Sequence, residues 1–203
     1  MSLRAGVIGC GSISRFHFDG IEKADGKVMA ICDLDDEATR PFAEKYGCEV
    51  STDWKAVTDD PDIEVVHVTV FSRLHREICL RAIEQGKAVI CEKTLTEDPA
   101  DSLEVIEAAR KRGVVFYTSY MKRFIPAVQK TVELLPTIGR LMAASIRSYQ
   151  GWGNNWEGEP AGDFFNRPET GESAVKRAYG GGILVCGGSH ILDLVCHLFG
   201  RPS

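Results

Sequence analysis

Two closely spaced glycines near the beginning of the chain stand where an apolar run meets a helix-forming run. Residues 7–14 read VIGCGSIS. In a dinucleotide-binding loop the first glycine makes a tight turn, the second lets the backbone approach a pyrophosphate, and a small third residue lets the helix lie close to the strand. These roles fall to Gly9, Gly11 and Ser14, where serine departs from the usual glycine or alanine. The alternative is an ordinary glycine turn. The expected phosphate contacts, at the start of the helix, are Gly9, Gly11, Ser12 and Ile13.

An acidic residue follows the loop at the distance typical of a ribose-binding carboxylate. The apolar run 27–32 ends at Asp33, which would accept hydrogen bonds from an adenosine ribose. Asp35 and Asp36 come next, and no Lys or Arg lies between Asp33 and Arg40. NAD is therefore favoured over NADP as the cofactor, because a 2′-phosphate would meet an acidic cluster. The two later aspartates would equally supply favourable charge at a helix N-terminus.

Short apolar runs alternate with helix-forming runs over the first 121 residues. This alternation predicts an α/β fold with a doubly wound parallel sheet of the Rossmann type, covered by helices on both faces. Pro41 falls inside one helical run and should kink that helix or shift its start. Strands are expected at 5–8, 28–32, 65–70, 88–91 and 114–118, and helices at 12–23, 35–46, 53–57, 74–85 and 99–112.

The pattern changes after residue 122. A helix is expected over 124–135, with proline in its first turn, and an extended strand over 139–149. A polar stretch rich in glycine, with two tryptophans, then runs to about residue 179, and a loop of that length is usually functional or disordered. The apolar run 191–199 predicts a largely buried helix.

The composition of the chain excludes some classes of protein. A net charge of −5 over 203 residues, without a basic stripe, argues against a nucleic-acid partner. No apolar run is long enough to cross a bilayer, and the chain runs directly into its first strand, so neither a membrane span nor a signal peptide is expected. The seven cysteines are never spaced as Cys-x-x-Cys. They indicate reduced, mostly buried thiols in a cytoplasmic protein and no metal site.

Three separated stretches together resemble the family of glucose-fructose oxidoreductase and inositol dehydrogenase. They are the loop at 9–11, the run 89–93 that ends in Glu-Lys, and the segment 180–193 that contains His190. The resemblance implies a Rossmann domain over 1–121 that binds NAD. It also implies that 122–203 is the first part of an α+β open-sheet domain that binds a small-molecule substrate and forms homo-oligomers when complete. Family members are longer, so the chain is expected to be a fragment or a truncated product.

The resemblance assigns the chemistry to two residues. Glu92 and Lys93 match the first two residues of the family's Glu-Lys-Pro motif, which places both beside the cofactor and Lys93 at the substrate hydroxyl near the nicotinamide. The alternative for Lys93 is a solvated lysine after a strand. An ammonium there stabilises the charge that develops on oxygen as hydride leaves. Thr94 replaces the proline. His190 matches the family's histidine that accepts and returns the hydroxyl proton, although a structural histidine is the alternative. Asp193 could hold its ring or act as a capping carboxylate.

Two departures from the family pattern affect the expected site. Cys186 stands where the family usually has an aspartate that touches the substrate or orients the histidine, and a thiol cannot replace a carboxylate in binding a diol. After the strand at 65–70, residues 71–73 (Phe-Ser-Arg) stand where the family commonly has Thr-Pro-Asn, whereas His75 matches the Leu-His pair that follows. Ser72 and His75 are expected beside the cofactor, with helix packing as the alternative for His75. The further candidates for substrate contact are Trp152 and Arg123.

These features leave three functions open. The first is an NAD-dependent dehydrogenase that acts on a secondary alcohol of a sugar, sugar acid or cyclitol. The second is an NAD-binding module without turnover, which Thr94 and Cys186 favour. The third is a glycosidase that works through transient oxidation by NAD.

Overall fold

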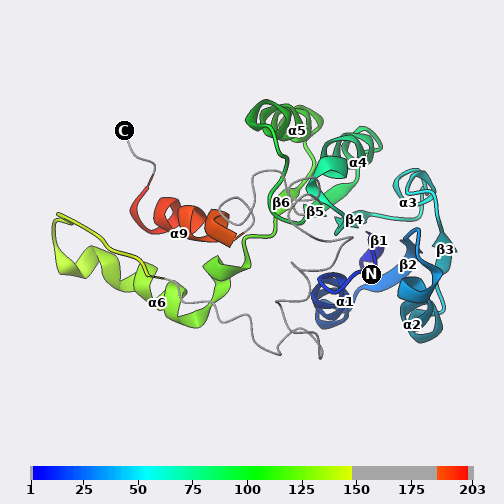
Figure 1. Ribbon diagram of the computed structural model, residues 1–203, viewed down its shortest axis with the longest axis horizontal. Coiled ribbons are helices and arrows are strands. Elements are labelled where there is room, and N and C mark those ends of the chain that lie inside the picture. The colour runs from blue at the N-terminus through cyan, green and yellow to red at the C-terminus, as the bar shows by residue number, and fades with distance from the viewer. Residues whose placement is uncertain (1, 148–186, 201–203) are drawn as a thin grey trace, which may run out of the picture. The chain divides into compact units, whose positions relative to one another are not determined.

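The computed structural model describes residues 2–147 and 187–200, which belong to two compact units (Figure 1). The first unit is Met1–Ser119 and the second is Tyr120–Ser203. Each unit is described by itself below.

The first unit is built on a parallel sheet of six strands in the order β3-β2-β1-β4-β5-β6. The chain starts in the middle of the sheet, winds outward through β2 and β3, and then crosses back to β4, β5 and β6. This confirms the doubly wound sheet predicted from the alternating runs. The strands are β1 (Arg4–Ile8), β2 (Lys27–Cys32), β3 (Glu49–Ser51), β4 (Val65–Val68), β5 (Ala88–Cys91) and β6 (Phe116–Thr118). No strand was predicted at β3, because three residues are too few for a periodic pattern.

Helices cover both faces of this sheet, and each face has its own hydrophobic core. On one face Phe18 and Ile21 of α1 pack against Val7 and Ile31, with α2 alongside. On the other face α3, α4 and α5 cover the sheet, as Figure 1 shows. The strands are apolar on both faces because both are buried. The helices are α1 (Ser14–Lys23), α2 (Asp36–Tyr46), α3 (Lys55–Thr58), α4 (Ser72–Glu84) and α5 (Pro99–Arg112).

Local chemistry fixes the ends of these helices. The Asp35 carboxylate accepts a hydrogen bond from the backbone N–H of Glu37 and caps α2. Helix α2 starts five residues before Pro41 and continues through it, so the expected shift of the helix start did not occur. At the other end of the helix, Gly47 is left-handed (φ 58°), a conformation that glycine adopts without steric cost.

The register of the strands aligns their carboxyl ends. Ile8 of β1 pairs with Val68 of β4, and Val68 pairs with Cys91 of β5. The residues that follow these strands therefore share one edge of the sheet, where ligands of open α/β folds bind.

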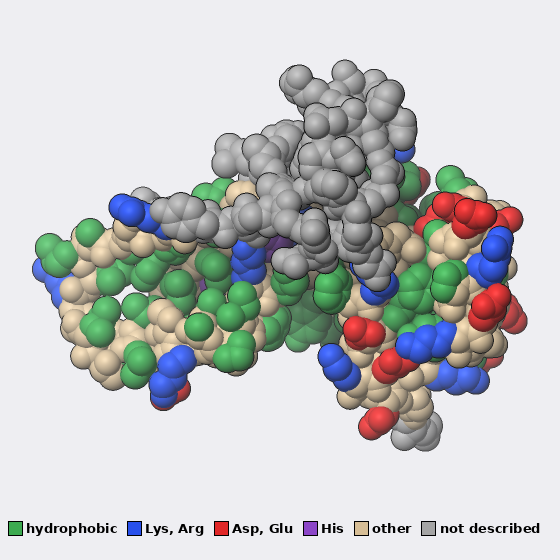
Figure 2. All heavy atoms as spheres, turned by 60° about the horizontal axis from the view of Figure 1, so that its bottom comes forward, with side chains coloured by type: hydrophobic (Ala, Val, Ile, Leu, Met, Phe, Trp, Pro, Cys, Tyr) green, Lys and Arg blue, Asp and Glu red, His purple; other side chains and the backbone are tan. Residues whose placement is uncertain are grey.

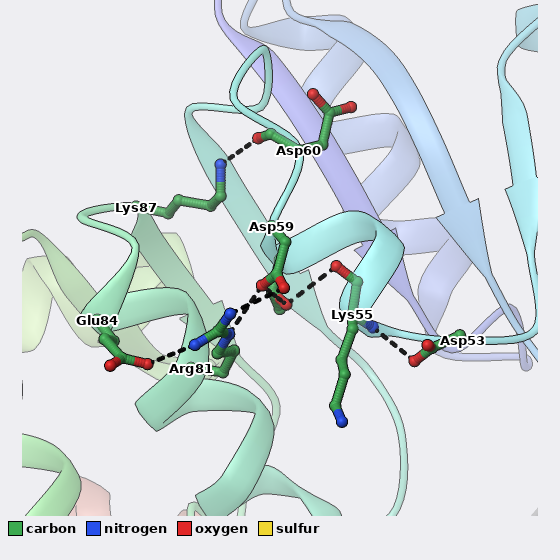
Figure 3. Close-up of polar contacts among 8 residues, drawn as sticks. Asp53, Lys55, Asp59, Asp60, Arg81, Glu84 and Lys87 are labelled. Carbon is green, nitrogen blue, oxygen red and sulfur yellow. Dashed lines mark hydrogen bonds and ion pairs between the residues drawn. The ribbon is translucent and has the colours of Figure 1, made fainter.

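A polar network lies at the opposite, amino-terminal edge (Figure 3). Arg81 of α4 binds the Asp59 carboxylate at 2.8 Å, and it binds Glu84 at 2.7 Å. The buried Lys87 ammonium donates to the backbone carbonyls of Asp60 and Ile63. The network ties α4 and the start of β5 to the loop before β4, so its role is structural.

The second unit has a 3₁₀ turn η1 (Met121–Phe124), helix α6 (Pro126–Leu134), a turn η2 (Leu135–Ile138) and helix α9 (Ser189–Phe199). The helix expected at 124–135 is present, with proline in its first turn. The strand expected over 139–149 is not formed at 139–147. A strand needs a neighbour for its backbone groups, and the described part of this unit offers none.

Hydrophobic side chains are prominent on the surface of the second unit (Figure 2). Phe124, Ile138 and Met142 are 71%, 65% and 80% exposed. Helix α9 was expected to be largely buried, and this was wrong. It buries one face, which includes His190 and Leu194, whereas Leu192 is 62% exposed.

Candidate cofactor site and catalytic residues

The turn after β1 accepts glycine only. Gly9 has φ 97°, and a Cβ atom there would lie 2.8 Å from the backbone carbon and oxygen of Thr69. The Thr69 hydroxyl donates a hydrogen bond of 2.6 Å to the Gly9 carbonyl. The Gly9 N–H donates to the Cys32 carbonyl at 2.8 Å. The loop is therefore fixed to both strands that flank β1.

The rest of the loop leaves room for a phosphate group. A Cβ atom on Gly11 would meet no described residue within 4 Å, so the backbone is open on that side. The Ser14 hydroxyl is buried and donates to the Gly11 carbonyl at 2.6 Å, which explains how serine replaces the usual glycine or alanine. Ile13 provides no side-chain cap for α1. The N–H groups of Ser14 and Phe16 donate to the carbonyls of Gly11 and Ile13. The positive end of the helix dipole still lies at this loop and favours an anion there.

The carboxylate of Asp33 is part of the same loop structure. Its Oδ2 accepts a hydrogen bond of 2.6 Å from the backbone N–H of Cys10, and its Oδ1 accepts one of 3.1 Å from Asp35. A carboxylate has about four acceptor positions, so it can still accept ribose hydroxyls. Burial, followed by the nearby Asp33, raises the pKa of the Cys10 thiol to about 12, so this cysteine stays protonated. The glycine turn, the open loop and the carboxylate fit a dinucleotide.

Lys93 follows β5 at the carboxyl edge of the sheet. The N–H of the preceding residue, Glu92, donates to the Val68 carbonyl at 2.9 Å and extends the pairing of β5 with β4. The N–H of Lys93 itself donates to Glu92 Oε2 at 3.1 Å. The peptide bond between Lys93 and Thr94 is cis. The hydrogen bonds of the Glu92 and Lys93 N–H groups hold the backbone of Lys93 at the sheet edge where the glycine loop also lies.

The other carboxylate oxygen of Glu92 faces two buried histidines. Glu92 Oε1 lies 3.1 Å from His17 Nε2, and His17 Nδ1 lies 2.9 Å from His67 Nδ1. Burial and, to a smaller extent, the neighbouring His17 together lower the pKa of His67 to about 3. Burial alone would raise the pKa of Glu92, but the hydrogen bonds from His17 and from the Lys93 N–H outweigh it and the pKa is lowered. Glu92 is therefore ionised and His67 neutral near pH 7.

His75 and Ser72 lie on α4, and their side chains contact the chain itself. His75 is 1% exposed, with Nδ1 2.9 Å from the Leu95 carbonyl and Nε2 2.9 Å from the Val70 carbonyl. Nδ1 also lies 3.1 Å from the Thr94 carbonyl. The ring therefore contacts the backbone of the segment that follows Lys93.

Among its contacts, Ser72 donates to Glu97 at 3.2 Å. Both Ser72 and His75 were expected beside the cofactor. The structure shows that both contact the segment after Lys93, Ser72 at Glu97 and His75 at the Thr94 and Leu95 carbonyls. A direct contact of either residue with the cofactor stays a prediction.

His190 and Arg123 belong to the second unit, whereas Lys93 belongs to the first. The ring of His190 is buried near the start of α9 and meets the Tyr120 ring edge-on, with centroids 5.9 Å apart. The Arg123 guanidinium binds both oxygens of Asp193, with Nε 2.8 Å from Oδ2. Asp193 was expected to hold the His190 ring or to act as a capping carboxylate. The structure shows a different role, as the ion-pair partner of Arg123. Cys186 and Trp152 lie outside the described residues.

Three residues that shape this site were not singled out from the sequence. They are His17, His67 and Thr69. A signal for His67 was present, because a histidine interrupts the apolar strand Val65–Val68. The other two have no distinctive sequence pattern, since their roles depend on partners far along the chain.

The described residues bring together no group of three or more His, Cys, Asp or Glu side chains suited to a metal ion. Across the same residues, no helix is both long enough and apolar enough to span a membrane.

The parallel sheet, the glycine turn and the carboxylate after β2 define a dinucleotide-binding Rossmann unit. The family described as "Oxidoreductase family, NAD-binding Rossmann fold" matches residues 3–120. The chain belongs to this family, which is the family of glucose-fructose oxidoreductase and inositol dehydrogenase that the sequence resembled.

Individual relatives agree with this assignment. The chain is 30% identical over 177 residues to levoglucosan dehydrogenase of Pseudarthrobacter phenanthrenivorans, covering 85% of this chain and 43% of that protein. It is 31% identical over 150 residues to myo-inositol 2-dehydrogenase of Thermotoga maritima, covering 72% of this chain and 45% of that protein. A solved 3-ketoreductase from Actinomadura kijaniata, in complex with NADP and TDP-benzene, matches 68% of this chain and 43% of its own, with a TM-score of 0.62 and 28% identity. The matched part of the chain therefore covers less than half the length of each of these proteins.

Proposed function

We propose that this protein is an NAD-dependent oxidoreductase that oxidises a secondary alcohol of a sugar, sugar acid or cyclitol. One observation carries the proposal: Asp33 is bound to the N–H of Cys10 in the phosphate loop, at the same sheet edge from which Lys93 emerges. The dehydrogenases of levoglucosan and myo-inositol among the relatives support the substrate class. A cytoplasmic, homo-oligomeric protein belongs to the same proposal, supported by the buried thiols and by the exposed hydrophobic side chains of the second unit.

Each proposed catalytic residue has one task. A bound nicotinamide supplies the hydride acceptor. Lys93 donates a hydrogen bond to the alcohol oxygen and stabilises the negative charge that grows there as the C–H bond breaks. His190 accepts the hydroxyl proton, which suits imidazole because its ordinary pKa is near neutrality. The products are a ketone, a reduced nicotinamide and a protonated histidine, so electrons and protons balance.

NAD is proposed over NADP because of the charge at the end of β2. The Asp33 carboxylate is half-buried, and Asp35 and Asp36 follow it. Asp35 is already engaged as the cap of α2. A ribose hydroxyl can donate to Asp33, whereas a 2′-phosphate there would be repelled by it.

Titration of the chain with NADH and with NADPH tests the cofactor assignment. Asp33→Asn keeps an acceptor for the Cys10 N–H but removes the charge, and a hydrogen bond to a charged group contributes enough that NADH should bind roughly tenfold more weakly. The affinity for NADPH should change less, so the preference for NADH over NADPH becomes smaller. Glu44→Gln is the matched control, since it removes the same charge from an exposed position further along α2, away from the end of β2. Equal effects of both substitutions, or binding of neither dinucleotide, would contradict the assignment.

Reduction of NAD in the presence of a panel of sugars, sugar acids and cyclitols tests the reaction. Turnover that is lost in Lys93→Met and in His190→Gln supports the dehydrogenase. Bound NAD without turnover on any alcohol would indicate a binding module. Release of free sugar from glycosides without net NADH would indicate a glycosidase.

A further inference from the structure

A buried chain of three polar side chains lies directly behind Lys93. His17 comes from α1, His67 from β4, and Glu92 from the residue after β5. The two histidines are 8% and 6% exposed, and the side chain of Glu92 is 13% exposed. Buried ionisable groups are costly unless they are paired, so this cluster calls for an explanation that the proposed reaction does not yet give.

The protons of the cluster can be assigned from its geometry. Glu92 is an ionised acceptor, so His17 must carry hydrogen on Nε2 to bond with Oε1. In a neutral His17 the opposite nitrogen, Nδ1, is then an acceptor, and His67 donates to it from its own Nδ1. In a protonated His17 the second bond reverses. In both cases the hydrogen bond from His17 to Glu92 is retained.

This bond restrains the backbone that carries the lysine. The same carboxylate accepts the Lys93 N–H through Oε2. From α4, the His75 ring lies 3.1 Å from the carbonyl of the next residue, Thr94. The backbone is therefore restrained at the Lys93 N–H and again at the Thr94 carbonyl, one residue further along. On one side the restraint leads back to α1, the helix whose N-terminus would receive the cofactor phosphate.

We propose that His17 is a positioning residue for Lys93. It fixes the Glu92 carboxylate, and Glu92 fixes the backbone from which the ammonium reaches the substrate oxygen. This inference rests on the proposed function, since it assigns Lys93 a substrate to reach. The phosphate loop leads directly into α1, and α1 carries His17. The helix at the proposed cofactor phosphate therefore also sets the position of Lys93 relative to the cofactor.

Three variants of α1 separate positioning from simple loss of stability. His17→Leu removes the hydrogen bond to Glu92. His17→Gln keeps it, because the amide nitrogen of glutamine reaches the place of Nε2. Phe18→Leu is the matched control: the neighbouring Phe18 is 1% exposed and stacks on Phe42 and Tyr46 of α2, with ring centroids 4.0 and 5.3 Å apart. It therefore perturbs the packing of α1 without touching the cluster.

The expected result is a separation of kcat from cofactor binding. Misplacement of a catalytic group by about 1 Å costs on the order of 100-fold, so His17→Leu should lower kcat for alcohol oxidation roughly 10- to 100-fold. The dissociation constant of NADH should stay within about twofold of the unsubstituted protein, because the phosphate loop is intact. His17→Gln should restore most of kcat. A kcat in His17→Leu no lower than in Phe18→Leu would overturn the proposal.

A second measurement does not depend on catalysis. Hydrogen exchange of the Lys93 amide, followed by NMR in the absence of cofactor, reports the bond from that amide to Glu92. It should be roughly tenfold faster in His17→Leu and near the unsubstituted rate in His17→Gln and Phe18→Leu, since about 1.4 kcal/mol of lost protection corresponds to a factor of ten. Equal rates in all of these proteins would overturn the positioning role. If no alcohol is oxidised, the proposed function fails, and this measurement still decides whether His17 holds the lysine backbone.

Discussion

His67 should make the stability of the first unit depend on pH. It lies in the middle of β4 and is 6% exposed. Burial, with a further contribution from His17, lowers its pKa from 6.5 to about 3. The ring is thus neutral in the folded protein at every pH where the protein is ordinarily handled, whereas in the unfolded chain it takes up a proton below about pH 6.5.

The sign and size of the effect follow from this difference in pKa. A lowered folded pKa means that the unfolded state binds more protons, so the free energy of unfolding rises with pH. The stabilisation from a neutral His67 is fully present above about pH 6.5 and is lost as the pH falls toward 3. Between about pH 7 and about pH 5 the loss amounts to about 2 kcal/mol. His67→Gln, which keeps a polar partner for His17, should remove this part of the pH dependence.

Urea denaturation near pH 7 and near pH 5 measures this loss of stability in both proteins. Trp54 is a fluorescent probe in the first unit once Trp152 and Trp156 are replaced by phenylalanine. Burial also lowers the pKa of His75, and because His75 is present in both proteins, the comparison isolates His67. If the protein with His67 and the His67→Gln variant lose the same stability on acidification, His67 is not held neutral by the fold and the reasoning is refuted.

Three further predictions concern other parts of the first unit. Gly9→Ala should lower stability by at least about 1–3 kcal/mol, since it combines left-handed backbone with a clash against Thr69, and it should abolish NADH binding; unchanged urea unfolding would contradict the tight turn. Lys87→Met should cost about 1–3 kcal/mol because two buried carbonyls lose their donor, and an unchanged unfolding midpoint would contradict this. In native protein near pH 8, iodoacetamide should modify the exposed Cys196 well before Cys10, whose raised pKa and burial suppress its reaction. Mass spectrometry of peptides reads the order, and early modification of Cys10 would contradict its burial and raised pKa.

Much of the fold was readable from the sequence because its signals are local. Alternating apolar and helical runs are enough to predict a parallel sheet, and turn glycines and capping aspartates mark the helix ends. The failures have physical causes as well. β3 is too short to show a period, and the run beginning at Gly139 has strand-like composition but no neighbouring strand in the described part of its unit. In helix α9 the polar residues lie on one side, yet Ser189 and His190 of that side are buried while the apolar Leu192 is exposed, so hydrophobicity along the helix did not predict its buried face.

The cofactor loop and the lysine at the sheet edge were determined by the sequence alone. A glycine turn, a carboxylate after the next strand and a lysine after β5 each follow a strand, and parallel strands bring their carboxyl ends to one edge. Only the tertiary structure decided which side chains hold these groups in place. His17 is 50 residues from His67 and 75 from Glu92, and Asp193 pairs with Arg123, 70 residues away. Local periodicity predicts neighbours within a helix or strand, but a buried polar group bonds to whatever donor the packing of distant elements brings within about 3 Å.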